Sequence, residues 1–145
     1  MNILGIDYGH KRIGLSYADT ELGVAVPIPA AVEPDFESRM GHIAVEIKRR
    51  RIDMLVVGYP FNMDGTLGQK AREVDNFIEE LIRRFKLPVE RADERLSSYQ
   101  AESDMLAFSG GKRKTLSERK KERLSGEIDS RASALFLQEY LDTQM

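Results

Sequence analysis

The sequence predicts a single α/β domain built on a mixed five-stranded sheet with helices on both faces. Three apolar runs of strand length follow one another near the N-terminus, and two more alternate with amphipathic helical segments. Short links favour antiparallel neighbours, whereas strand-helix-strand crossovers give parallel ones. These connections predict strand order 3-2-1-4-5 with the second strand antiparallel, and 145 residues suit one domain spanning 1–145.

The first half of the chain supplies four strands and one helix. Residues 2–6, 13–18 and 24–32 are apolar runs separated by turns, which predicts a meander of three strands. Asp35 can cap a helix, and apolar side chains recur along one face of it, at Phe36, Met40, Ile43, Ala44 and Ile47. Residues 54–58 form a nearly continuous apolar run, which is typical of a central parallel strand.

The second half alternates helices with one more strand. Thr66 and Gln69 form a capping box before an apolar stripe made of Ala71, Val74, Phe77, Ile78, Leu81, Ile82 and Phe85. Pro88 begins a strand that runs through Ala92. We expect further helices over residues 97–110 and 127–141, and a short one capped by Thr115 and Glu118 between them.

Composition removes several classes of chemistry. The chain has no cysteine, so disulfides, cysteine nucleophiles and thiolate zinc sites are excluded. Its two histidines, His10 and His42, are too few for a histidine-rich metal site. No apolar run approaches the roughly 20 residues that cross a bilayer, and the N-terminus does not resemble a signal peptide. We therefore expect a cytoplasmic protein with no membrane partner.

Carboxylates are predicted to gather at one edge of the sheet. Asp7 ends the first strand, and Asp93 and Glu94 end the fifth, so both places lie at the carboxyl edge of parallel strands. Asp129 lies on the packing face of the last helix, which also carries Ala132, Ser133, Phe136, Leu137 and Tyr140. Each alone could be a turn residue, a surface residue or an acidic residue favoured by a helix N-terminus. Together, without histidine or cysteine, they indicate a site for a hard cation such as Mg²⁺ or Mn²⁺.

Basic residues form a separate cluster. Residues 112–123 hold seven basic and two acidic side chains, although the whole chain has a net charge of −2. This segment could be a solvated helix face or could bind a polyanion. We expect Lys112, Arg113 and Lys114 to contact nucleic-acid phosphates, on a segment that closes over its substrate.

Four motifs together resemble a known family. IDYGHKRIG at 6–14, VVGYPFNMDG at 56–65, DERLSS at 93–98 and GEIDSRASALFLQEYL at 126–141 are similar to the YqgF family of RNase H-like proteins, also called RuvX. The resemblance covers essentially the whole chain. One departure is Ser133, where the family usually has a second alanine, although a small residue is kept.

The resemblance implies a metal-dependent nuclease for the 5′ end of precursor 16S rRNA. The alternative substrate is a Holliday junction, so structured RNA, branched DNA and ribosomal precursor particles are the expected partners. The family's acidic positions carry over to Asp7, Glu94 and Asp129 as catalytic residues and ligands of two Mg²⁺ or Mn²⁺ ions. Spacing leaves Asp93 open as a ligand, since alternation along a strand points one of the two neighbours away, and we favour the longer Glu94.

Lys11 and Arg12 follow the first acidic turn, where they could contact substrate phosphates or form a solvated hairpin. Gly14 is expected to serve hairpin geometry. Two other classes of protein compete with the nuclease. A non-catalytic nucleic-acid or ribosome-assembly module would gain nothing from three carboxylates facing phosphates. An actin-like ATPase would need two such domains around its nucleotide. The sequence does not distinguish RNA from DNA, the polarity of cleavage, or monomer from dimer.

Overall fold

A five-stranded sheet forms the centre of the molecule in the computed structural model, which describes residues 1–61, 68–94 and 115–144. The strands are β1 (Asn2–Asp7), β2 (Ile13–Asp19), β3 (Val24–Ala31), β4 (Met54–Tyr59) and β5 (Val89–Asp93). The helices are α1 (Phe36–Arg49), α2 (Gly68–Phe85), α4 (Leu116–Ser125) and α5 (Glu127–Gln144).

The order of the strands confirms the predicted topology. The sheet runs β3-β2-β1-β4-β5, with β2 antiparallel to both of its neighbours and β1, β4 and β5 parallel. Asp7 lies opposite Gly14 in the β1–β2 register, and Tyr59 lies opposite Asp93 between β4 and β5. The carboxyl ends of β1, β4 and β5 therefore share one edge, as the crossovers require.

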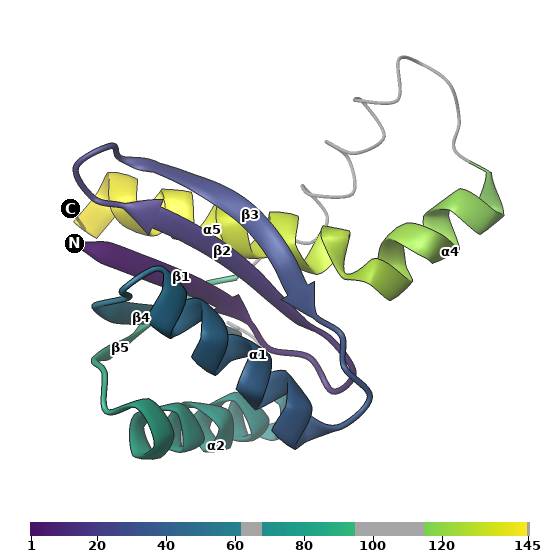
Figure 1. The fold of residues 1–145 in the computed structure, drawn as a ribbon, viewed down its shortest axis with the longest axis horizontal. Helices are drawn as coiled ribbons and strands as arrows, with labels where there is room; N and C mark the ends of the chain where they lie inside the picture. The colour runs from purple at the N-terminus through teal and green to yellow at the C-terminus, as the bar shows by residue number, and fades with distance from the viewer. Residues whose placement is uncertain (62–67, 95–114, 145) are drawn as a thin grey trace.

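Helices cover both faces of this sheet. Figure 1 shows α1 and α2 on one side and α5 lying along the other, with α4 extending beyond the end of the sheet. The face under α1 and α2 holds the larger apolar cluster, whose members include Leu4, Ile6, Ile43, Leu55 and Leu81. The face under α5 holds a smaller cluster built around Ile3, Val56, Phe136 and Leu137. Two cores thus lie back to back across one sheet.

Small side chains let α5 approach the sheet closely. A Cβ added at Gly5 would collide with the side chain of Ser16 and press on Ser133 and Leu137. The hydroxyls of Ser16 and Ser133, both fully buried, are 2.7 Å apart and form a hydrogen bond. Ser133 therefore keeps the close contact that its small size predicted, and its hydroxyl gains a partner in the sheet.

The capping residues predicted for α1 and α4 are confirmed by their hydrogen bonds. Asp35 caps α1 by accepting a hydrogen bond from the Ser38 amide at 2.8 Å. Thr115 and Glu118 form the reciprocal capping box of α4, with bonds of 3.1 and 3.2 Å. Two predictions lie outside the described residues: the capping role of Thr66 and the helix over residues 97–110.

Three details differ from the expected pattern. Ile82 was expected in the buried stripe of α2, but it is 49% exposed, because the stripe continues from Leu81 to Phe85 and Ile82 lies beside it on the helix. The last helix continues to Gln144, three residues past the expected end. Gly126 has a φ of +78°, and a Cβ there would press against Ala30, so this glycine permits the sharp junction between α4 and α5.

Within the described part of the chain, each helix is too short or too polar to span a lipid bilayer.

Candidate active site

Asp7 faces the α5 side of the sheet at the end of β1. Its neighbours alternate between the two cores, with Ile3 in the cluster under α5 and Leu4 and Ile6 in the opposite one. A strand turns successive side chains to opposite faces, so Asp7 shares the face of Ile3 and Gly5. This parity carries its carboxylate towards the first turn of α5.

Glu94 lies on the same side, one residue beyond β5. Its amide donates a hydrogen bond to the carbonyl oxygen of Tyr59 at 3.4 Å, which continues the pairing of the two strands. A Cβ added at Gly58 would come within 3.3 Å of the Glu94 Cβ, so the two residues are neighbours on one face. Ala92 belongs to the core under α5, and the alternation of β5 therefore turns Asp93 towards the opposite face.

Asp129 reaches the site from the first turn of α5. A Cβ added at Gly14 would collide with the Asp129 backbone and lie within 2.8 Å of its Cβ. Gly14 is the residue opposite Asp7, so the helix rests directly beside the end of β1. The expectation that Gly14 serves hairpin geometry was incomplete, because close helix packing requires a residue without a side chain here.

The surroundings of Asp7 and Asp129 shift the pKa values of both carboxyl groups. The pKa of Asp7 is raised well above its ordinary value of 3.8, chiefly by burial and then by the charges of Glu94 and Asp129. A hydrogen bond with the Glu94 side chain also raises it, because this bond favours the protonated form. Burial likewise raises the pKa of Asp129, although Arg12 opposes that shift. Asp7, hydrogen-bonded to Glu94, therefore favours its protonated form in the absence of a cation.

Arg12 pairs directly with the third carboxylate. Its Nε donates to Oδ2 of Asp129 at 3.0 Å, and the two side chains are 33% and 30% exposed. The sequence predicted a phosphate contact for this arginine, and the ion pair with an acidic residue of the same site was missed. Lys11, its neighbour, is exposed to solvent.

Lys70 is a further charged residue that sequence reasoning missed. Its Nζ donates to the carbonyl oxygen of Tyr8 at 3.3 Å, from the first turn of α2. Its positive charge lowers the pKa of both Asp7 and Asp129. The available signal was topological: a helix that follows a parallel strand begins at the edge where that strand ends.

The three carboxylates are suitable ligands for a hard cation, but they do not lie close enough together to coordinate one in this structure. Three carboxylates and no nitrogen or sulfur donor match the oxygen ligands of Mg²⁺ or Mn²⁺. Among the residues that the structure describes, no three acidic or histidine side chains are close enough together to hold an ion. Asp7 and Glu94 share a hydrogen bond, while Asp129 is turned to Arg12.

The predicted basic contacts divide into two groups. Lys112, Arg113 and Lys114 lie outside the described residues. Of the same basic cluster, Lys120 and Lys121 are exposed on α4. Lys120 and Lys121 are therefore open to solvent in the helix that directly precedes α5, whereas Arg119 of the same cluster is half-buried.

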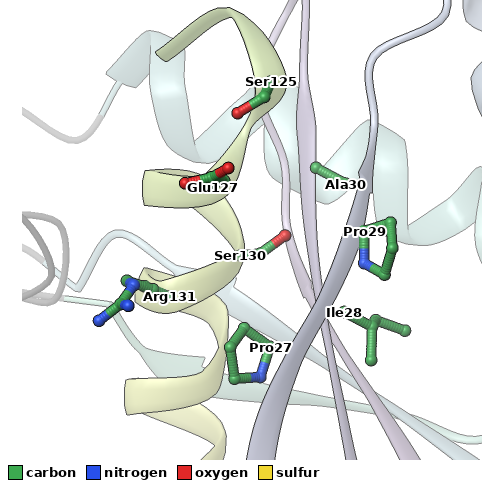
Figure 2. A pocket seen from close by; sticks show the side chains of 8 residues that line it. All are labelled: Pro27, Ile28, Pro29, Ala30, Ser125, Glu127, Ser130 and Arg131. Carbon is green, nitrogen blue, oxygen red and sulfur yellow. The ribbon is translucent and has the colours of Figure 1, made fainter. Parts of the chain in front are cut away.

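A cavity of about 430 Å³ lies between β3 and the start of α5, away from the carboxylates. Figure 2 shows it lined by Pro27, Ile28, Pro29 and Ala30 on one side and by Ser125, Glu127, Ser130 and Arg131 on the other. Its lining is largely apolar and includes none of Asp7, Glu94 and Asp129. We place the chemistry at the carboxylate edge instead, because phosphate chemistry needs charge rather than an apolar wall.

Comparison with known proteins gives consistent matches along the whole chain. The profile of the RuvX family, described as Holliday junction resolvase, matches residues 1–143. A relative from Opitutus terrae is 45% identical over 143 residues, which cover 98% of this chain and 92% of that one. A relative from Synechococcus elongatus is 38% identical over 142 residues, covering 97% and 89%. Both carry the name "Putative pre-16S rRNA nuclease".

Solved structures agree on the fold. RuvC of T. thermophilus, in complex with Holliday junction substrate, aligns with a TM-score of 0.53 at 20% identity, covering 98% of this chain and 95% of that one. A Fowlpox virus resolvase, in complex with Holliday junction DNA, gives 0.55 at 13% identity, covering 97% and 99%. These likenesses confirm the predicted RNase H-like sheet. The profile match and the sequence identities show that the chain belongs to the RuvX family of nucleases.

Proposed function

We propose that this protein is a divalent-metal-dependent nuclease that cleaves precursor 16S rRNA, with Asp7, Glu94 and Asp129 as its metal ligands. The observation that carries the proposal is the position of these three carboxylates along one edge of an RNase H-like sheet, where Asp7 and Glu94 share a hydrogen bond. Such a cluster destabilises a fold that has no use for it, since like charges repel in a half-buried place.

The acidic residues and the basic ones have complementary tasks. A divalent cation held by the carboxylates would supply the charge that activates water and stabilises the leaving oxygen. Asp7 would have to lose its proton to act as a ligand, and Asp129 would have to turn from Arg12. Lys70 places a positive charge near Asp7 and Asp129, which favours the ionised forms of these two carboxylates.

Substrate phosphates would meet basic side chains on two sides of this edge. Lys11 is exposed on the β1–β2 connection, and Lys120 and Lys121 are exposed on α4. Lys112, Arg113 and Lys114 are proposed to add contacts of the same kind. Contacts to the sugar-phosphate backbone position a nucleic acid without reading its sequence, so we expect affinity to fall steeply with salt.

The choice of RNA rests on the relatives. Two proteins more than a third identical to this chain carry a name that specifies precursor 16S rRNA, whereas the family description specifies Holliday junctions. Holliday-junction cleavage is therefore the second candidate. We assign the protein to the cytoplasm, where precursor rRNA and ribosomal particles would be its partners.

The test is a cleavage assay with and without Mg²⁺ or Mn²⁺. Substrates are an RNA spanning the 5′ end of 16S rRNA with its precursor sequence, and a four-way DNA junction of similar size. We expect metal-dependent cleavage of the RNA at a defined site. Preferred cleavage of the junction would establish the second candidate, and cleavage of neither by well-folded protein would contradict the nuclease assignment.

Two variants distinguish the site from contaminating activity. Glu94→Gln keeps the size of the side chain and removes its charge, so it should abolish cleavage of any substrate that the wild type cuts. Asp93→Asn is the matched control, because Asp93 is the adjacent acidic residue on the opposite face. Equal loss of activity in both variants would remove Glu94 from its proposed role as ligand.

A further inference from the structure

Arg12 lies between an acidic residue of the candidate active site and a cavity lined by other basic residues. On one side its guanidinium pairs with Asp129 at 3.0 Å. On the other it lines a cavity of about 320 Å³, together with Lys11, Arg39 and Glu33. One arginine therefore lies between an acidic site that would hold a cation and a pocket whose lining is mainly basic.

The wall of this cavity is built rigidly. Arg39 is 7% exposed, and its guanidinium donates to the carbonyl oxygens of Glu33 at 2.7 Å and His10 at 3.1 Å. These bonds tie the β1–β2 connection to the segment before α1. Because carbonyl oxygens do not neutralise a charge, Arg39 contributes positive potential to the cavity, and its buried Nε has no hydrogen-bond partner in the described part of the chain.

The acidic residue of the wall is partly compensated, since only Oε2 of Glu33 has a hydrogen-bond partner and its buried Oε1 has none in the described part of the chain. One carboxylate oxygen of Glu33 lies 2.8 Å from Nδ1 of His42, and its pKa is lowered partly by that hydrogen bond. Three basic residues face the cavity against this one acidic residue. The surroundings of Arg12 on this side therefore favour an anion of one or two charges, such as a backbone phosphate.

We propose that Arg12 exchanges partners during loading: it neutralises Asp129 in the cation-free protein and moves to a nucleic-acid phosphate in this cavity when Asp129 takes up its metal. This proposal rests on the proposed function. It adds a phosphate-binding subsite, and it explains why the three carboxylates are not close enough to hold a cation in this structure. Asp129 is withheld from the cluster by an ion pair, and the same arginine becomes available to substrate when that pair opens. Binding of metal and binding of a non-scissile phosphate are thereby coupled through one side chain.

The first experiment measures Mn²⁺ affinity by calorimetry in the absence of nucleic acid. Arg12→Ala removes the cation that competes for Asp129, so we expect Mn²⁺ to bind about two- to fivefold more tightly, the range of a partly exposed ion pair. Lys11→Ala is the matched control, since it removes the same charge from the adjacent residue, which is exposed to solvent, and leaves the Arg12–Asp129 ion pair in place. Its Mn²⁺ affinity should change by less than about twofold.

The outcomes separate this inference from the proposed function. Unchanged or weaker Mn²⁺ binding in folded Arg12→Ala, with normal binding in the wild type, would overturn the exchange and leave the metal site standing. Equal tightening in Lys11→Ala would also overturn it, because the effect would then be one of net charge. Failure of the wild type itself to bind Mn²⁺ would contradict the proposed function first.

A second experiment changes Asp129 instead of Arg12 and measures nucleic-acid binding. In EDTA, Asp129→Asn releases Arg12 from its ion pair, so a nuclease-resistant oligonucleotide should bind more tightly than to the wild type. Glu127→Gln removes one negative charge from the same first turn of α5, where Glu127 is exposed to solvent, and leaves the Arg12–Asp129 ion pair in place, so it serves as the control for reduced repulsion. Equal gains in the two variants would overturn the proposal. The gain of Asp129→Asn should disappear when Arg12→Ala is combined with it.

Discussion

The two faces of the sheet are packed in different ways, although the same strands form both. The face under α1 and α2 is filled by bulky aliphatic and aromatic side chains, and it forms the larger of the two cores. The face under α5 is packed through glycines, serines and Ala132, which allow the helix to lie close to the strands. Only the second face ends in the carboxylates, so close packing there fixes where the acidic groups meet.

This difference indicates that one face contributes more to the stability of the fold, while the other positions the residues of the candidate active site. Bulky packing contributes free energy in proportion to the apolar area that it buries. Close packing through small residues buries less, but it sets the position of a helix to within a fraction of an ångström. Asp129 depends on that accuracy, because it begins the helix that rests on Gly14, the partner of Asp7 in the sheet.

The largest expected effect is on catalysis, from Asp7→Asn on the α5 face. Loss of one ligand removes several kcal/mol of transition-state stabilisation, which corresponds to about a 1,000-fold loss of cleavage rate. The fold should remain intact, since the variant relieves repulsion among the carboxylates. Single-turnover cleavage and a thermal melt on the same sample check both statements, and an unfolded variant would show that Asp7 is structural.

The opposite pattern is expected for Leu81→Ala on the other face. Leu81 is a fully buried residue of α2, more than three turns along the helix from its N-terminal end, which approaches the site. We expect the free energy of unfolding to fall by about 2–5 kcal/mol. Cleavage per folded molecule should stay close to that of the wild type. Denaturant titration gives the first quantity, and a large loss of specific activity well below the transition would show that the faces are not independent.

Gly14→Ala should affect both properties, because it changes the spacing between α5 and the sheet. The new methyl group would meet the Asp129 backbone, and overpacking of this kind costs about 1–3 kcal/mol. Displacement of Asp129 should also lower the cleavage rate and the Mn²⁺ affinity. Gly23→Ala, with open space around its Cβ, serves as a comparison for stability alone, since its φ of +70° makes that substitution strained without touching the site. A Gly14→Ala variant with full Mn²⁺ affinity would contradict the spacing argument.

A smaller effect is expected at the serine pair between β2 and α5. Ser16→Ala leaves the buried hydroxyl of Ser133 without its partner at 2.7 Å, which should cost about 1–3 kcal/mol. Combining it with Ser133→Ala, which restores the alanine typical of the family, should recover most of that loss. Chemical denaturation of the two single variants and the double variant measures the coupling. Additive losses would mean that the pair contributes by packing alone.

The smallest effect expected is a difference in pH dependence. Folding raises the pKa of Asp7, so the stability that its protonated form contributes is complete below its ordinary value of 3.8 and is lost as pH rises through the folded-state pKa. Cation-free Asp7→Asn should therefore be more stable than the wild type at about pH 7 but not at about pH 3. Glu37 and Glu80, whose pKa values are lowered by arginine partners, titrate equally in both proteins and cancel in the comparison. A constant difference across this range would contradict the raised pKa.

The sequence by itself determined the order of elements and, through connection lengths, the strand order. It also placed Asp7 and Glu94 at the same edge, since crossover connections leave little choice about which strand ends meet. It could not decide between Glu94 and Asp93 by spacing alone, although the strand parity seen at Ala92 now places Glu94 on the face of Asp7. The sequence also did not predict which residues the basic side chains contact.

Tertiary structure decided everything that depends on the distance between elements far apart in sequence. The ion pair of Arg12 with Asp129 and the approach of Lys70 to Tyr8 join segments that no local pattern connects. Gly14 is required by a helix more than a hundred residues away in the chain, so its role could not be derived from the hairpin that contains it. The physical reason is that local propensity and periodicity fix the direction of a side chain relative to its own strand or helix, whereas its partners are set by how closely those elements pack.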